Sequence, residues 1–301
     1  TRTKCNEALL EGTKVRMIAT ATIGLDHIDL DYCRAKGIEV HNAEGCNAGG
    51  VLQYVFSALY GVAARKAIKL DDFTMGIVGV GHVGSLVEKM ARYLGFKVLL
   101  CDPPRAAAEG DEKFCSLEYL LENSQIVTLH VPLDETTRKM ADANFFAMMP
   151  TGSIFINASR GEVVDEEALM LTLPKFGAVV IDTWNNEPDV NEELVEMVDI
   201  ATPHIAGYSY QGKLNGTAAS VQAVARHFGI EPLYDFYPQE QGDEDRSPVL
   251  LALKGKTQGE VAAVFQYNYP IYTDDFRFRM EPHNFEKMRS NYQYRREIYV
   301  E

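Results

Sequence analysis

Three charged side chains in the second half of the chain each follow a short apolar run: Arg160, Glu187 and His204. An arginine can bind an anionic substrate, a histidine can take and give a proton near neutral pH, and a carboxylate can orient that histidine. In an open α/β sheet, ligands bind outside the carboxyl ends of the strands, where these side chains are expected to lie. The three residues therefore predict an enzyme site for an anionic substrate.

Any one of these residues alone would more simply be a surface charge or a loop histidine. Their occurrence after three strands of one sheet is what favours catalysis. A competing histidine, His130, follows an earlier apolar run. We expect His130 to form a wall that faces a cofactor, and His204 to be the acid and base.

The rest of the chain predicts the sheet that would position these side chains. Apolar runs alternate with amphipathic stretches from about residue 15 to residue 208, which is typical of a doubly wound parallel sheet. Strands are expected at residues 15–19, 38–41, 75–79, 97–101, 125–131, 152–157, 178–182 and 198–201. The clearest helices are expected at residues 29–36, 50–64, 83–94, 166–173 and 217–228.

A Gly-x-Gly-x-x-Gly sequence, formed by Gly79, Gly81 and Gly84, lies between an expected strand and an expected helix. The glycines permit a tight turn, a close approach of the backbone to a pyrophosphate, and close packing of helix on strand. Amide groups around His82 and Val83 would face the phosphates at the start of the helix. Glycine-rich turns also occur without ligands, but the flanking elements here favour a nucleotide.

Asp102 ends the next expected strand, 23 residues after Gly79. This is the expected place for a carboxylate that hydrogen-bonds a ribose hydroxyl. Asp102 favours NAD over NADP because it would repel the additional phosphate of NADP. Arg105 is close enough in sequence to bind that phosphate, although Pro103 and Pro104 could direct it elsewhere.

Composition excludes several classes of protein. A chain of 301 residues fits two or three domains, and its net charge of −14 argues against binding to nucleic acid. No apolar run approaches the roughly 18 residues that a membrane-spanning helix needs. Five scattered cysteines without a Cys-x-x-Cys pair indicate a reduced, cytoplasmic protein without a metal site.

The pattern changes after residue 234. Residues 238–246 are polar and acidic, which indicates a linker or an exposed loop. Beyond them we expect strands at residues 249–253, 261–267 and 276–280 and a helix at residues 284–296. Residues 238–301 are therefore expected to form a small α+β domain.

The motifs occur in an order that resembles the D-isomer-specific 2-hydroxyacid dehydrogenases, over about residues 10–230. The stretches that carry the resemblance are Gly79-x-Gly81-x-x-Gly84, Asp102, Asn157-Ala-Ser-Arg-Gly161, Asp182-x-Trp-x-x-Glu-Pro188 and Pro203-His-Ile-Ala-Gly207. The resemblance implies that Arg160 binds a substrate carboxylate, that His204 is the acid and base, and that Glu187 supports it. It also implies a Rossmann domain for NAD and a flavodoxin-like substrate domain.

A narrower likeness is to the branch of this family that oxidises 4-phospho-D-erythronate in vitamin B6 biosynthesis. It is carried by residues 19–27, 44–48, 100–105 and 204–208, and by Gly212-Lys213 and Gly216-Thr217. This likeness implies a homodimer formed by the C-terminal domain. It divides the chain into a substrate-binding segment (1–48), an NAD-binding domain (49–203), a return to the substrate domain (204–237) and the dimerisation domain (238–301).

The narrower likeness also implies contact residues. Those for the substrate are Thr1, Thr22 and Tyr208, and Lys4 or Lys213 could add positive charge for a phosphate. Those for NAD, beside the glycine loop, are Asp102, Val131, Ala158, Ser159, Arg160, Asp182 and Gly207. The family begins with a further strand–helix–strand segment, so this chain is expected to be an N-terminally incomplete version.

Three alternatives stay open at this point. The substrate could be another D-2-hydroxy acid, such as 3-phosphoglycerate or glycerate. A formate dehydrogenase is disfavoured, because that relative has glutamine where Glu187 stands. A non-catalytic NAD-sensing protein is the most remote alternative, because all three charged side chains are present.

Overall fold

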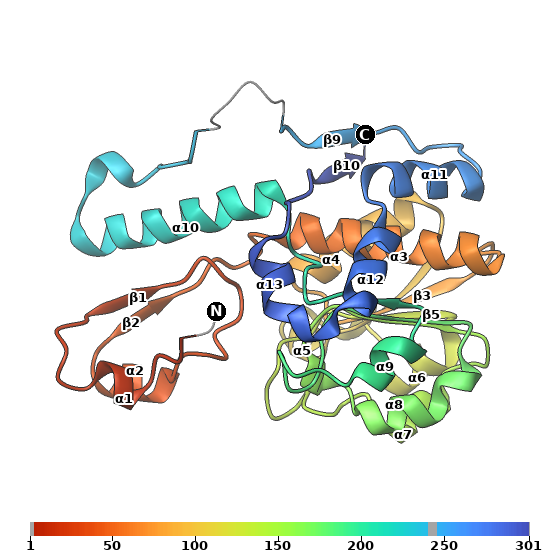
Figure 1. Cartoon of the computed structure of the whole chain (residues 1–301), viewed down its shortest axis with the longest axis horizontal. Coiled ribbons are helices and arrows are strands. Elements are labelled where there is room, and N and C mark those ends of the chain that lie inside the picture. The colour runs from red at the N-terminus through yellow and green to blue at the C-terminus, as the bar shows by residue number, and fades with distance from the viewer. Residues whose placement is uncertain (1–2, 240–245, 301) are drawn as a thin grey trace.

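The computed structural model describes residues 3–239 and 246–300, and its centre is a six-stranded parallel sheet (Figure 1). The strands are β3 (Thr74–Val78), β4 (Lys97–Cys101), β5 (Ile126–Leu129), β6 (Ile154–Asn157), β7 (Ala178–Ile181) and β8 (Ile200–Ala201). Their order is β4-β3-β5-β6-β7-β8, so the chain runs outward in both directions from β3. The doubly wound α/β sheet expected from the sequence is confirmed.

Helices cover both faces of this sheet because successive strand residues point to opposite sides. Ile77 and Ile156 pack with α3 (Ala48–Lys66) and α4 (His82–Tyr93) on one face. Phe155 packs on the other face, which is covered by four shorter helices. These are α6 (Leu117–Asn123), α7 (Ala143–Met148), α8 (Glu166–Thr172) and α9 (Glu192–Met197).

A smaller parallel pair of strands precedes the sheet, β1 (Met17–Ala19) with β2 (Glu39–His41). Both strands were expected, and α10 (Tyr210–Phe228) packs against β1 after the chain returns from the large sheet (Figure 1). Two short helices, α1 (Glu7–Leu10) and α2 (Leu30–Ala35), complete this segment. Its own small apolar core contains Leu10, Ile28, Cys33 and Ile38.

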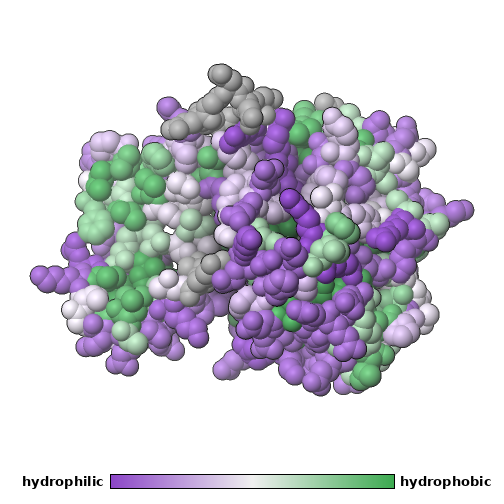
Figure 2. All heavy atoms as spheres, in the orientation of Figure 1, coloured by the Kyte–Doolittle hydropathy of each residue, from purple (hydrophilic) through white to green (hydrophobic). Residues whose placement is uncertain are grey.

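The surface of this segment differs from that of the large sheet. Figure 2 shows a mainly hydrophilic face over the large sheet, and apolar atoms gathered at the left over the segment. Exposed apolar side chains there include Leu9, Leu30, Phe228 and Ile230. Within the two described ranges, no helix has the length and apolar character that would let it cross a membrane.

The C-terminal segment differs from the sequence prediction in two of its three expected strands. Residues 261–267 and 276–280 lie in helices, α11 (Gln258–Asn268) and α12 (Ile271–Met280). Aromatic and β-branched residues are frequent in both stretches, and their strand preference misled the prediction. The third expected strand is present as β9 (Val249–Leu251), which pairs in parallel with β10 (Ile298–Val300).

The helix expected at residues 284–296 is also largely absent. Only α13 (Phe285–Ser290) is helical, and the chain after it extends toward β10. The backbone there bonds to the start of α10, where Tyr210 N–H donates to Arg295 O at 2.7 Å. These tertiary hydrogen bonds outweigh local helix preference. The expected acidic linker falls mostly on residues 240–245, outside the described residues.

The C-terminal segment shares the core of the large sheet. Phe265 of α11 stacks on Tyr60 and Phe56 of α3, with ring centroids 5.5 and 6.0 Å apart. The carboxylate of Asp275 in α12 accepts a hydrogen bond of 2.7 Å from the N–H of Ala201, in the edge strand β8. The segment therefore packs on α3, the helix that lies over one face of the sheet, and on the edge strand β8.

Candidate active site

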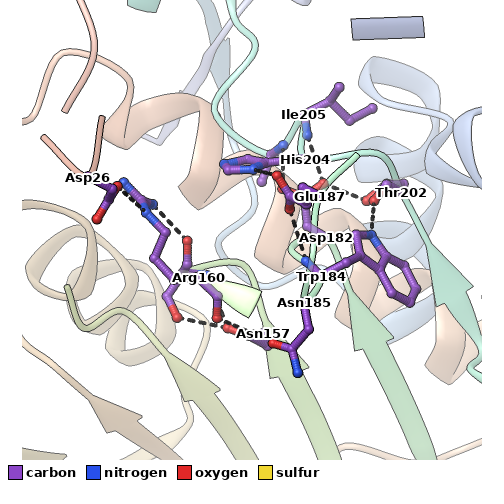
Figure 3. Close-up of polar contacts among 12 residues, drawn as sticks. Asp26, Asn157, Arg160, Asp182, Trp184, Asn185, Glu187, Thr202, His204 and Ile205 are labelled. Atoms are coloured by element: carbon purple, nitrogen blue, oxygen red, sulfur yellow. Dashed lines mark hydrogen bonds and ion pairs between the residues drawn. The ribbon is translucent and has the colours of Figure 1, made fainter. Parts of the chain in front are cut away.

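His204 and Glu187 form a hydrogen-bonded pair at the carboxyl end of the sheet (Figure 3). His204 Nδ1 lies 2.8 Å from Glu187 Oε2, and the side chains are 29% and 21% exposed. Glu187 Oε1 accepts a 2.9 Å hydrogen bond from Trp184 N–H. Burial raises the pKa of Glu187, but the charge and hydrogen bond of His204 outweigh it and leave that pKa below its usual value. Glu187 is therefore an anion at neutral pH.

The backbone of His204 has a left-handed φ of 55°, which is uncommon for a residue other than glycine. Asp182, at the end of β7, holds the loop in this shape. Its fully buried carboxylate accepts hydrogen bonds from Ile205 N–H (2.8 Å), Ala206 N–H (2.9 Å) and the Thr202 hydroxyl (2.7 Å). The loop that carries His204 is thus anchored to the neighbouring strand (Figure 3).

Arg295 holds the same loop from the C-terminal segment. Its buried guanidinium donates to Ala206 O at 2.6 Å and to Ile205 O at 3.2 Å. The guanidinium also lies 4.0 Å from the ring centroid of Tyr269 in the C-terminal segment. Carbonyls that follow His204 are therefore fixed by a residue 90 positions further along the chain. No local sequence pattern indicates this contact.

Arg160 follows β6 and reaches across to the first segment of the chain (Figure 3). Its Nε lies 3.2 Å from Asp26 Oδ2, and its Nη1 donates to Ser159 O at 2.8 Å. A Cβ atom on Gly24 would lie 2.1 Å from Arg160 Nη2, so a side chain at residue 24 would displace this guanidinium. The sequence prediction did not single out Asp26 or Gly24.

The three charged side chains come from neighbouring strands, as the sequence analysis expected. Arg160 follows β6, Glu187 follows β7 and His204 follows β8, and these strands are adjacent in the sheet. Glu187 and His204 are in direct contact, whereas Arg160 bonds to Asp26. The geometry suits a base with an ionised partner, beside a cation whose outer N–H groups can bind a carboxylate.

The glycine turn fits a dinucleotide. Gly79 has a φ of 85°, and a Cβ there would lie 2.6 Å from His130 O. A Cβ on Gly84 would lie 2.0 Å from Gly79 O, whereas a Cβ on Gly81 would meet nothing within 4 Å. Gly81 is the N-cap of α4 and has no side chain to bond the first N–H groups of that helix. Space and free donors therefore coincide where phosphates bind.

Asp102 ends β4 and braces this turn. Its carboxylate accepts hydrogen bonds from Val80 N–H at 2.7 Å and from Arg105 N–H at 3.0 Å, capping α5 (Pro103–Glu109). Arg105 turns back to Val80 O at 2.6 Å and to both carboxylate oxygens of Glu109. Because Glu109 already neutralises Arg105, this arginine is a poor receptor for the additional phosphate of NADP.

The remaining expected NAD contacts lie around the same end of the sheet. Val131 follows β5, and Ala158 and Ser159 follow β6. Gly207 packs against Asn47, whose side-chain nitrogen would lie 2.2 Å from a Cβ there. His82 and Val83 begin α4, with the His82 side chain exposed. These positions are compatible with the predicted cofactor contacts.

His130 differs from His204 in its surroundings. Its Nε2 lies 3.0 Å from the hydroxyl of buried Thr128, and desolvation lowers the pKa of His130 to about 3. A ring that stays neutral throughout the physiological pH range cannot exchange protons there. The preference for His204 over His130 as the acid and base is consistent with this geometry.

The expected substrate contacts are spread over two segments. Thr22 Oγ1 bonds to Thr20 Oγ1 at 2.7 Å and to Gly24 O at 3.2 Å. The Tyr208 ring lies 5.8 Å from that of Tyr292 in the C-terminal segment. Thr1 lies outside the described residues. Within those residues, no group of three or more His, Cys, Asp or Glu side chains could hold a metal ion.

Comparison with known proteins identifies similar chains. Residues 60–206 match the family model "D-isomer specific 2-hydroxyacid dehydrogenase, NAD binding domain". The erythronate-4-phosphate dehydrogenase of Bacteroides thetaiotaomicron is 44% identical over 99% of this chain and 84% of the relative. That of Chromohalobacter salexigens is 48% identical over 76% of this chain and 61% of the relative.

A solved structure of a dehydrogenase has a similar fold. The D-lactate dehydrogenase of Aquifex aeolicus, complexed with NAD and lactic acid, superimposes with a TM-score of 0.62 and 28% identity. The match covers 79% of this chain and 85% of the other.

Proposed function

The chain belongs to the D-isomer-specific 2-hydroxyacid dehydrogenases, and on that premise we propose that it oxidises 4-phospho-D-erythronate with NAD. The product would be (R)-3-hydroxy-2-oxo-4-phosphooxybutanoate, an intermediate of pyridoxal 5′-phosphate (vitamin B6) biosynthesis. The His204–Glu187 pair beside the glycine turn carries the reaction type. The choice of substrate is supported by the 44% identity to a named relative over nearly the whole chain, C-terminal segment included.

In this proposal each charged residue has one task. The outer N–H groups of Arg160 hold the substrate carboxylate, since its Nε already bonds to Asp26. His204 Nε2, which has no hydrogen-bond partner in the part of the chain that the structure describes, takes the proton of the C2 hydroxyl. Glu187 holds the proton on Nδ1 and stabilises the imidazolium that forms.

NAD, when bound, accepts the hydride that leaves C2. The residues that would hold it are the glycine turn, the start of α4 and Asp102. Asp182 and Arg295 keep His204 in place by holding the backbone that follows it. The substrate thus loses one hydride and one proton and becomes a 2-oxo acid.

Initial rates of NADH formation with 4-phosphoerythronate, 3-phosphoglycerate and glycerate test the proposal. We expect the largest kcat/KM for 4-phosphoerythronate. A preference for either other acid would replace the proposed substrate and leave the reaction type standing. His204→Ala should remove turnover but keep NADH binding, so a variant that still oxidises substrate would refute the proton-transfer role.

For the assembly, we propose a cytoplasmic homodimer formed by residues 238–301, with residues 1–48 and 204–237 as the substrate domain and 49–203 as the NAD domain. Exposed apolar side chains support the interface: Leu250 (61%), Tyr267 (88%), Phe276 (62%) and Met280 (64%). The five cysteines are all free, which suits a reducing compartment. Tyr267→Asp and Phe276→Asp should give monomers in light scattering, and dimers of unchanged mass would contradict this interface.

A further inference from the structure

We propose that Lys213 and Arg289, placed around the Tyr208 ring, bind the phosphate group of the substrate and so select phosphorylated over unphosphorylated 2-hydroxy acids. This inference rests on the proposed function, because it assigns residues to the far end of the proposed substrate. It also gives the C-terminal segment, which supplies Arg289, a direct role in specificity.

The two cations converge on one aromatic ring. Lys213 Nζ lies 4.6 Å from the centroid of Tyr208 and 5.0 Å from that of Tyr294. Arg289 Cζ lies 5.7 Å from the centroid of Tyr208. Lys213 is in the first turn of α10 and Arg289 is in the last turn of α13, and Figure 1 shows α13 beside that end of α10. Two distant segments therefore bring two positive charges to one place.

This place adjoins the catalytic pair. Tyr208 comes four residues after His204, in the loop that Asp182 and Arg295 hold. The charge of Arg289 is also close enough to contribute to the lowered pKa of Glu187. A substrate whose C2 hydroxyl reaches His204 can thus extend its other end toward Arg289.

Neither cation is held in a close ion pair by the described residues. Within residues 3–239 and 246–300, Lys213 and Arg289 form no ion pair with a carboxylate. Arg289 Nε is buried and makes no hydrogen bond there, which is costly for a charged donor. By contrast, the guanidinium groups of Arg279 and Arg105 donate to carboxylate and carbonyl oxygens through Nε and both terminal nitrogens. The unused donors of the pair therefore indicate an anionic ligand.

The net charge of the chain and the two local cations indicate the kind of ligand that binds beside Tyr208. The chain carries a net charge of −14, so a dianion approaches against an unfavourable overall field and needs local cations. A lysine supplies a compact charge and an arginine supplies directed donors, a combination that suits phosphate oxygens. Arg160 lies against Asp26 and is already assigned to the carboxylate end.

The test compares one substrate with and without its phosphate. We would measure kcat/KM for 4-phosphoerythronate and for erythronate with the native chain, Lys213→Met and Arg289→Met. Charge-assisted hydrogen bonds support a fall of about tenfold to a hundredfold in the ratio of the two kcat/KM values for each variant. The inhibition constant of inorganic phosphate should rise by a similar factor.

Lys287→Met is the matched control, because Lys287 is an exposed cation on the same helix as Arg289. This control should keep the native ratio. Circular dichroism and NADH binding establish that each variant is folded, and Arg289→Lys should recover part of the selectivity if charge is what matters.

Two results would overturn the inference: a ratio within threefold of native in both variants, or an equal fall for both substrates. A native chain that prefers erythronate would instead refute the proposed function. If the native chain prefers the phosphorylated acid and both variants keep that preference, only the assignment of Lys213 and Arg289 fails.

Discussion

Replacing Glu187 with glutamine tests the central pair without changing its shape. Glutamine can still accept the hydrogen bond that Trp184 N–H donates to Oε1. Its other terminal atom becomes an NH2 group, which faces His204 Nδ1 where a carboxylate oxygen now lies 2.8 Å away. A donor at this position favours the tautomer with its proton on Nε2, the atom that accepts the proton of the substrate in the proposed mechanism.

The expected fall in kcat follows from the loss of the hydrogen bond between the Glu187 carboxylate and His204. A hydrogen bond to a charged group contributes about 1.5–3 kcal/mol, which corresponds to a factor of roughly 10 to 150. In serine proteases, the equivalent amide substitution costs about 10⁴ in kcat because the tautomer is wrong. We therefore expect Glu187→Gln to lower kcat by about 10²- to 10³-fold, between these two limits.

The assay is the initial rate of NADH formation at saturating substrate, with NADH binding measured separately by fluorescence. Glu166→Gln is the matched control, because its carboxylate bonds to Asn185 N–H at 2.8 Å and the change is chemically the same. We expect the control to keep kcat within about threefold, since it leaves the tautomer of His204 unchanged. A Glu187→Gln enzyme with native kcat would refute the orienting role.

Three further predictions concern stability and cofactor binding. Gly161→Ala should lower the free energy of unfolding by about 1–3 kcal/mol, and with it the melting temperature, because a Cβ there would lie 2.0 Å from the backbone of Trp184. An unchanged melting temperature would contradict this packing. His130 has a folded-state pKa of about 3, below its ordinary 6.5, so the stability that depends on its neutral ring is complete above pH 6.5 and is lost as the pH falls toward 3. About 2 kcal/mol of that stability should be lost by pH 5, and urea titrations should show a flatter pH dependence in His130→Phe. Asp102→Ala removes the acceptor for Val80 N–H and should raise KM for NAD at least tenfold, with little change in kcat, in steady-state kinetics.

The sequence was sufficient for those parts of the fold and site that depend on local pattern. The central strands β5, β6 and β7 are short apolar runs, buried on both faces, and each was identifiable by composition alone. Parallel topology then places the ends of β6, β7 and β8 together, which is why Arg160, Glu187 and His204 could be grouped in advance. The glycine turn could also be identified in advance, because Gly79 and Gly84 have no room for a side chain and Gly81 leaves open space beside the turn.

Contacts between distant segments could not be predicted in this way. Asp26 is 134 residues from Arg160, and Arg295 is 90 residues from Ile205, so no periodicity connects them. The two C-terminal helices were missed for a different reason. Their aromatic content suggested strands, yet the Thr257–Glu260 capping box at the start of α11 was a helix signal that the sequence did contain.

The hydrogen bonds from Arg295 to the carbonyls after His204 can form only late in the synthesis of the chain. A ribosome releases the glycine turn and the whole large sheet long before it reaches residue 295. A nascent chain can therefore acquire its nucleotide fold early, while the loop that carries His204 still lacks the support of Arg295. A chain cut short before Arg295 would therefore keep the nucleotide fold and lose the two hydrogen bonds to the carbonyls of Ile205 and Ala206.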